Sequence, residues 1–290
     1  MQSSAASPID TRTPGFLSFA APFGVERLGM EERRVAVEPE SGECLAVDTD
    51  FAQPCFPLRA GKIQRPSLAE ETLSRDRLLN YLADKAGHRV IYVIAEAGFG
   101  KTTLVADYLR RSQLRAFWYR LDEEETDGLV FLRYLVASCR AVDPRLLARS
   151  AALLSEPTLQ PIRQDEVLDT VLAEMEALGE IPSALVLDDF HAVEPMPEVS
   201  SIVERLIARA PAGLQLVVAS RRTPGLSVAV LRARGQLAEL NRDELRFDES
   251  ETDRLFRDCY HHALEPDVLH DLQQRTDGWA ASLQLVRTAV

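Results

Sequence analysis

Residues 95–102, with the sequence AEAGFGKT, have the residue types and spacing of a loop that binds phosphate groups. Small residues let backbone amides curl around phosphates, and a helix beginning at the loop adds the partial positive charge of its N-terminus. In this pattern the Lys101 ammonium reaches the β- and γ-phosphates of ATP, and the Thr102 hydroxyl binds Mg²⁺. Ala95 replaces the first glycine of the pattern, which a small side chain tolerates where φ is not positive. The residues predicted to contact ATP or ADP are Ala95, Ala97, Gly98, Phe99, Gly100, Lys101, Thr102 and Thr103.

Two carboxylates follow a second apolar run, LVL at 185–187. A phosphate-loop nucleotidase needs an acidic residue at the end of a strand near Mg²⁺, and we predict that Asp188 is this metal partner. Asp189 is then placed to orient or deprotonate the attacking water as a general base. An isolated Asp-Asp pair is more often a solvated turn, but its place after a buried strand favours the metal site.

Arg221 follows a third apolar run, residues 216–219, and is a candidate sensor of the γ-phosphate. A single arginine at the end of a strand is equally often a surface ion-pair partner, so both interpretations stand. The adjacent Arg222 is expected to be solvated. The predicted catalytic set is Asp189, Lys101 and Arg221.

Apolar runs that alternate with amphipathic segments predict an α/β fold in which helices wrap a parallel sheet. Ligands bind such sheets beyond the carboxyl ends of the strands, where the motifs fall. The predicted strands are 90–94, 116–119, 183–187, 214–219 and 236–240. The predicted helices between them are 73–86, with Ser74 as N-cap, and 101–112, 129–139, 165–178 and 199–210.

The chain divides by composition into three predicted parts. Residues 1–60 are rich in Ser, Pro, Gly and Ala and are expected to be a loose extension with one hairpin over 32–47. Residues 61–241 form the nucleotide-binding domain. Residues 242–290 form a small helical domain, with helices from a capping box at Asp248 to about residue 260, over 266–274 and from residue 279. The last helix has no C-cap signal, which suggests a piece of something longer.

The composition narrows the class of protein. A formal net charge of −12 does not favour binding to a nucleic-acid backbone, and no nucleic-acid-binding element is visible in the sequence. The four cysteines have no metal-ligand spacing and are expected to be reduced thiols. The early apolar run at 16–25 is too short for a signal peptide or a membrane span. We therefore predict a cytoplasmic protein that does not contact membranes.

Several ordered blocks resemble the ATPase module of large LuxR-type transcriptional regulators of the MalT type, within the STAND class of P-loop NTPases. The resemblance implies an ADP-bound off state, an ATP-bound on state, an unknown inducer and possible self-association with ATP. It also implies that Arg75 lies near the adenine or ribose and that Arg221 is the sensor. Trp279 falls near the position of an adenine-contacting Gly-x-Pro, but the proline is absent and core packing is the alternative. The blocks are RP at 65–66 with LSRDRLL at 73–79, AEAGFGKTTL at 95–104, WYRLD at 118–122, LVLDDFH at 185–191, VVASR at 217–221, LRARGQLAEL at 231–240 and DGWAASLQL at 277–285.

The motifs predict a weak ATPase used as a signalling switch, in which slow hydrolysis resets the active state. The alternative is an AAA-like motor or initiator ATPase with rapid turnover. A scaffold that binds nucleotide without cleaving it would not need the second carboxylate, Asp189. A small-molecule kinase is not favoured, because a helical segment follows residue 241.

Overall fold

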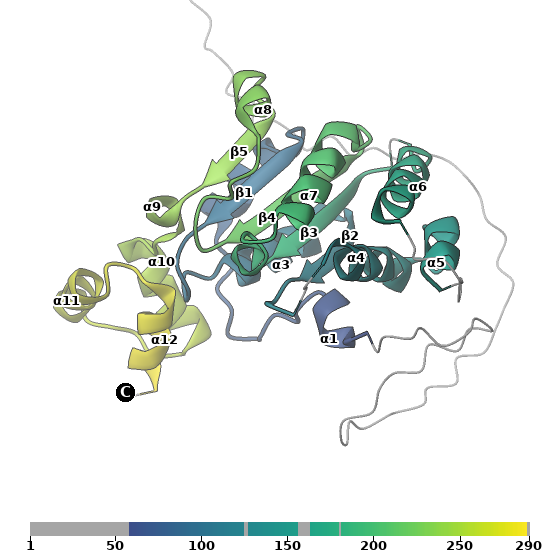
Figure 1. The fold of residues 1–290 in the computed structure, drawn as a ribbon. Coiled ribbons are helices and arrows are strands. Elements are labelled where there is room, and N and C mark those ends of the chain that lie inside the picture. The colour runs from purple at the N-terminus through teal and green to yellow at the C-terminus, as the bar shows by residue number, and fades with distance from the viewer. Residues whose placement is uncertain (1–57, 125–126, 156–162, 180, 289–290) are drawn as a thin grey trace, which may run out of the picture. The chain divides into compact units, whose positions relative to one another are not determined.

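The computed structural model describes residues 58–124, 127–155, 163–179 and 181–288. Its centre is a five-stranded sheet with the order β2-β3-β4-β1-β5, in which every neighbouring pair is parallel (Figure 1). The predicted strands are confirmed to within one residue at each end, because each is a short, nearly continuous apolar run. The strands are β1 (Val90–Ile94), β2 (Arg115–Arg120), β3 (Ser183–Asp188), β4 (Leu214–Ser220) and β5 (Leu237–Leu240).

Helices cover both faces of the sheet, because successive side chains of a strand point to opposite faces. Val90 and Tyr92 of β1 belong to the larger apolar core, which α4, α6 and α7 cover. Ile91 and Val93 face the other way, into a core that α2 and α3 cover. The covering helices are α2 (Asp76–Asp84), α3 (Lys101–Ser112), α4 (Gly128–Val142), α6 (Gln164–Glu176) and α7 (Pro197–Arg209).

The predicted start of the first long helix is wrong. The helix begins at Asp76, with Arg75 as its N-cap residue, and not near Leu73. Ser74 does not cap it, because the Ser74 hydroxyl donates a hydrogen bond to Asp107 of α3. The structure also contains short helices that the sequence did not predict: α1 (Ala60–Ile63), α5 (Ala148–Ser155), η1 (Phe190–Ala192), α8 (Ala229–Ala233) and α9 (Arg242–Leu245).

A group of helices follows α9 (Figure 1). Its apolar core includes Phe247, Phe256 and Leu283, and Leu73 from the segment before α2 also belongs to it. The predicted capping box is confirmed, since Asp248 accepts from the Glu251 amide and the Glu251 side chain accepts from the Asp248 amide. The elements are α10 (Glu249–Arg254), a π-helical turn η2 (Leu255–Cys259), α11 (Pro266–Thr276) and α12 (Ala280–Arg287).

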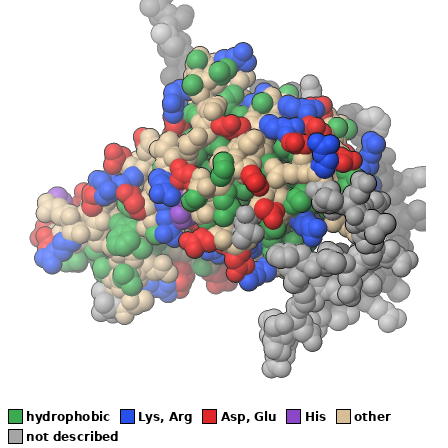
Figure 2. Space-filling view, viewed as in Figure 1, with side chains coloured by type: hydrophobic (Ala, Val, Ile, Leu, Met, Phe, Trp, Pro, Cys, Tyr) green, Lys and Arg blue, Asp and Glu red, His purple; other side chains and the backbone are tan. Residues whose placement is uncertain are grey.

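The predicted hairpin over 32–47 lies outside the described residues. Within the described part of the chain, none of the helices combines the length and the apolar character that crossing a bilayer requires. On the face seen in Figure 2, basic and acidic side chains are intermixed over the described surface.

Candidate functional site

The loop between β1 and α3 has the backbone of a phosphate-binding turn. Gly98 and Gly100 have φ of 81° and 78°, a region that residues with a side chain rarely adopt. Ala95 does not have a positive φ, so its methyl group is tolerated at the first position of the pattern. The Lys101 ammonium donates to the carbonyl oxygens of Ala95 (2.7 Å) and Glu96 (2.9 Å), and therefore lies across the loop. Burial lowers the pKa of Lys101, an effect that the carboxylates of the site oppose.

The two predicted Mg²⁺ ligands, Thr102 and Asp188, lie next to each other. The Thr102 hydroxyl lies 3.1 and 3.0 Å from the two carboxylate oxygens of Asp188, which is only 1% exposed. Burial, and then the nearby Asp189, raise the pKa of Asp188 to about 6, while the hydrogen bond from Thr102 opposes the rise. The negative charge of a buried carboxylate that lacks a basic partner is stabilised by a bound cation. The two residues fit Mg²⁺, which usually takes one or two protein ligands and completes its shell with phosphate and water oxygens.

Asp189 lies at the turn that ends β3, in the left-handed conformation with φ of 58°. Its amide donates to the Asp188 carboxylate (3.1 Å), and its own carboxylate accepts from Arg120 Nε (3.2 Å). Arg120 ends β2 and is opposite Asp188 in the register of β2 and β3. Sequence reasoning missed Arg120, although the block WYRLD placed it at the end of a strand next to the acidic pair.

Arg221 is exposed just beyond the end of β4, where its charge helps to lower the pKa of Lys101 and of His191. Its side chain has no hydrogen bond or ion pair with the described residues, so the surface ion-pair interpretation finds no partner there. The adjacent Arg222 is exposed, as predicted, and its guanidinium also forms a surface ion pair with Glu194. His191, in η1, is a further group beside the site, and its Nδ1 is buried without a hydrogen-bond partner in the described structure.

Arg75 is buried and joins the segment before α2 to the C-terminal helices. Its guanidinium donates to the carbonyl oxygens of Leu245 (2.7 Å) and Arg246 (2.6 Å), and pairs with Glu251 at 2.7 Å. It also lies 4.1 Å from the centre of the Phe247 ring. These contacts fix the position of the Arg75 side chain, and its predicted place beside an adenine or ribose stays a prediction.

A cavity of about 320 Å³ opens beside the phosphate loop, bounded by the loop, the start of α3, the segment before α2, and parts of η2 and α12. Its walls include Gly98, Gly100 and Thr103 of the predicted site, together with Arg75. Apolar side chains such as Leu73 form another part of its wall, and a mixture of apolar and polar groups is typical of ligand sites.

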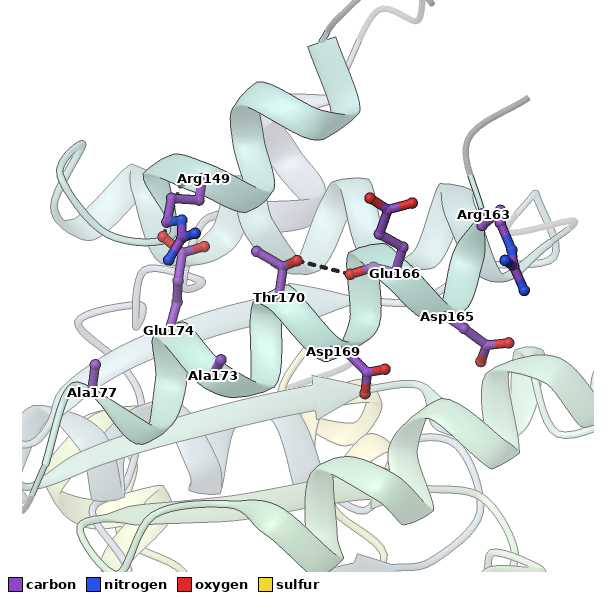
Figure 3. Close-up of a pocket in the computed structure, with 9 residues that line it drawn as sticks. All are labelled: Arg149, Arg163, Asp165, Glu166, Asp169, Thr170, Ala173, Glu174 and Ala177. Carbon is purple, nitrogen blue, oxygen red and sulfur yellow. Dashed lines mark hydrogen bonds between the residues drawn. The ribbon is translucent and has the colours of Figure 1, made fainter. Parts of the chain in front are cut away.

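A second cavity, of about 780 Å³, lies along α6 and is lined by none of the predicted site residues (Figure 3). Its acidic side chains have structural partners: Asp165 and Asp169 pair with Arg205 of α7, and Glu174 accepts from the first turn of α5, at Arg149 and Ser150. The cavity beside the loop is therefore the better candidate for a nucleotide.

Trp279 is not a core residue, because 38% of it is exposed. Its indole N–H donates to the carbonyl oxygen of Ala97 in the phosphate loop (3.0 Å). Sequence reasoning placed Trp279 near the nucleotide only through the family resemblance. Nothing in the local pattern DGWAA points to a contact with a loop about 180 residues earlier.

No protein-family model matches the chain. Sequence comparison aligns 225 residues, 78% of the chain, with the HTH-type transcriptional regulator MalT of Yersinia pestis at 30% identity and of Vibrio campbellii at 28%. Over these residues the chain resembles the MalT-type regulators. The resemblance predicted from the motifs is thereby confirmed, and the chain spans about a quarter of the length of these relatives (24%).

Among solved structures, the crystal structure of Cdc6p from Pyrobaculum aerophilum aligns with 79% of the chain and 63% of its own, with a TM-score of 0.50 and 13% sequence identity. This likeness concerns the fold alone. Together with the parallel sheet and the loop after β1, it confirms the predicted α/β P-loop NTPase fold of the MalT-like segment.

Proposed function

We propose that this chain is an ATP- and ADP-binding module of a MalT-like transcriptional regulator. The observation that carries the proposal is the contact between Thr102 and the buried Asp188 at the foot of the phosphate loop. A hydroxyl and a desolvated carboxylate side by side, next to Lys101, have the chemistry that a Mg²⁺–nucleotide complex requires.

The proposed roles follow from the positions of the side chains. Lys101 exchanges its hydrogen bonds to the loop carbonyls for the β- and γ-phosphates, and Thr102 and Asp188 hold Mg²⁺, which neutralises charge on the phosphates. Asp189 orients or deprotonates the water, and the exposed Arg221 senses the γ-phosphate. The loop residues from Ala95 to Thr103 cradle the phosphates, while Arg75 lies at the base or sugar in the adjoining cavity.

We further propose that residues 61–241 are the nucleotide-binding domain, that 242–290 are a helical domain, and that the two together act as a switch. Helices of the second part line the same cavity as the loop and contact it, so a ligand bound there meets both parts. A ligand shifts such an equilibrium only through contacts that differ between the two states, and the γ-phosphate is the group that ATP adds to ADP. Hydrolysis is slow in this scheme and returns the module to its ADP state.

The relatives' name supplies the proposed setting, a transcriptional regulator. From the family resemblance of the motifs we further propose that the protein is cytoplasmic, answers an inducer and self-associates in its ATP state.

The test is to purify the chain, denature it, identify any released nucleotide, and measure ATP turnover with Mg²⁺. We expect bound ADP and turnover well below the ~1–10³ s⁻¹ of ordinary enzymes. Lys101→Ala should emerge without nucleotide and Asp189→Asn should bind without turnover, while Lys85→Ala, a lysine substitution at the end of α2, serves as control. Rapid turnover without bound ADP would favour the motor alternative, and failure to bind any nucleotide would refute the proposal.

A further inference from the structure

The start of α12 is attached to the phosphate loop through two backbone carbonyl groups of the loop. The Trp279 indole N–H donates to Ala97 O, and the Ala281 amide donates to Gly98 O, each at 3.0 Å. Ala281 is the second residue of α12, and the amides of a first helical turn have no partner within their own helix. The loop therefore satisfies a donor that the helix leaves free.

Aromatic and close-packed contacts reinforce this attachment. The Phe99 ring lies 6.4 Å from the Trp279 ring, and the Arg242 guanidinium lies 5.5 Å from the centre of the same phenyl ring. A Cβ atom built on Gly98 would come within 2.7 Å of both the Ala281 methyl carbon and the Trp279 Nε1. Helix and loop backbone are thus in direct contact, with no room for a side chain between them.

The turn before α12 is held from its other side by the segment that follows β5. The Phe247 amide donates to Gly278 O (2.9 Å), and Arg246 pairs with Asp277 at 2.7 Å. The position of Trp279 is therefore set by residues 246–247 as well as by its own helix.

The orientation of a peptide group links these contacts to phosphate binding. In a trans peptide the C=O and N–H bonds point in opposite directions. Holding Ala97 O and Gly98 O on the side of α12 turns the amides of Gly98 and Phe99 away from that helix. Amides of a phosphate loop bind anions only when they converge on one point.

We propose that Trp279 is a positioning residue of the phosphate loop: together with the Ala281 amide it fixes the two peptide groups whose N–H groups take part in holding nucleotide phosphates. The inference rests on the proposed nucleotide function and adds the means by which the C-terminal helices control that site. When α12 leaves the loop, the two peptide groups are free to rotate and the loop loses affinity.

The central variant is Trp279→Phe, which retains a ring against Phe99 but removes the indole N–H. A second variant, Ala281→Pro, removes the other donor at a position in the first helical turn where proline is tolerated. The matched control is Leu285→Ser, on the same helix, where the side chain is 66% exposed. All variants are compared in the full chain, with circular dichroism to verify that each is folded.

Two measurements separate this inference from the proposed function. Hydrogen exchange of the peptides covering residues 95–104, without nucleotide, reports the loop itself. Titration with a fluorescent ATP analogue and Mg²⁺ reports affinity. For Trp279→Phe we expect loop exchange at least about threefold faster and affinity about two- to tenfold weaker, the range for one lost neutral hydrogen bond. Leu285→Ser should match the wild type in both.

Unchanged loop exchange in both Trp279→Phe and Ala281→Pro would overturn the inference. So would faster loop exchange with unchanged affinity in a chain whose wild type binds the analogue. If the wild type binds no nucleotide, the proposed function fails, and the exchange measurement still decides whether Trp279 holds the loop. If Trp279→Phe does not fold, Ala281→Pro decides alone.

Discussion

The Thr102 hydroxyl lies 3.0 Å from a carboxylate oxygen of Asp188, although 86 residues separate the two in sequence. Asp188 has no basic side chain within hydrogen-bonding distance in the described structure, and burial keeps its pKa raised at about 6. Without a metal ion, this residue should lower the stability of the fold while serving the proposed site.

The first prediction concerns this cost. The folded pKa of about 6 exceeds the unfolded value of ~3.9, so the folded chain holds the proton more tightly. The contribution of Asp188 to the free energy of unfolding is therefore highest below pH 4, and it falls by about 3 kcal/mol as the pH rises through 4 to 6. Asp188→Asn should remove this slope, because the amide does not titrate. It should stabilise the metal-free protein at pH 7 by about 1–2 kcal/mol, less than the full ~3 kcal/mol, because the amide has one acceptor oxygen fewer than the carboxylate. Urea unfolding in EDTA at pH 5 and pH 7 measures the difference, and equal slopes in both proteins would contradict it.

The second prediction separates the backbone of Asp189 from its chemistry. Asparagine tolerates the left-handed conformation that this residue adopts, whereas alanine loses about 1 kcal/mol there. Asp189→Asn should therefore unfold at the wild-type urea concentration and Asp189→Ala at a lower one. If the proposed role holds, turnover in both variants falls by at least about 100-fold. If turnover is lost in Asp189→Ala, which is also less stable, but kept in Asp189→Asn, the role of Asp189 is structural.

The third prediction concerns the buried pair of Arg75 and Glu251, whose side chains are each 7% exposed. Arg75→Ala leaves the Glu251 carboxylate buried without its main partner and should cost about 3–5 kcal/mol of unfolding free energy. Arg77→Ala is the matched control, because Arg77 contacts the same carboxylate oxygen at 3.2 Å with a side chain that is 45% exposed. That substitution should cost less than about 1 kcal/mol. Similar losses for the two variants in urea unfolding would contradict the assigned difference.

The fourth prediction compares two glycines of the same loop. Gly98 and Gly100 have nearly the same positive φ, so alanine carries a similar backbone penalty at both. A methyl group at residue 98 would also collide with the Ala281 and Trp279 side chains, whereas nothing lies within 4 Å of that position at residue 100. Gly98→Ala should therefore lower the thermal unfolding temperature further than Gly100→Ala and increase hydrogen exchange in α12. Equal effects would argue against the tight contact.

The sheet could be predicted from the sequence because each strand is a short apolar run. Such a run is recognised from its own residues, without knowing its contacts with distant segments. The loop, the Asp188–Asp189 pair and α3 were found for a related reason: local residue types dictate a turn that leads into a helix. Trp118 shows the limit, since its block WYRLD indicated a strand but not that Arg120, two residues later, would pair with Asp189.

The errors come from contacts between distant segments. Ser74 has the chemistry of an N-cap, but its hydroxyl donates to Asp107, which lies 33 residues away. The contact of Trp279 with Ala97 depends on how the C-terminal helices fold back, and a single sequence carries no record of that arrangement. Short helices such as α8 have too few turns to produce a recognisable period.

The pairing of β1 has a consequence for the order in which this protein can fold. Among the described strands, β1, which carries the phosphate loop, is hydrogen-bonded to β4 and β5, and its Val90 pairs with Leu216 and Leu237. Pairing β1 with β4 and β5 closes long stretches of chain, which costs conformational entropy and makes the pairing slow. A nascent chain must also reach residue 240 before β1 has both neighbours. Until then the apolar strand β1, and the phosphate loop that follows it, lack at least one of these neighbouring strands. The nucleotide site is thus among the last features to form during synthesis, and truncations that end before β5 should aggregate.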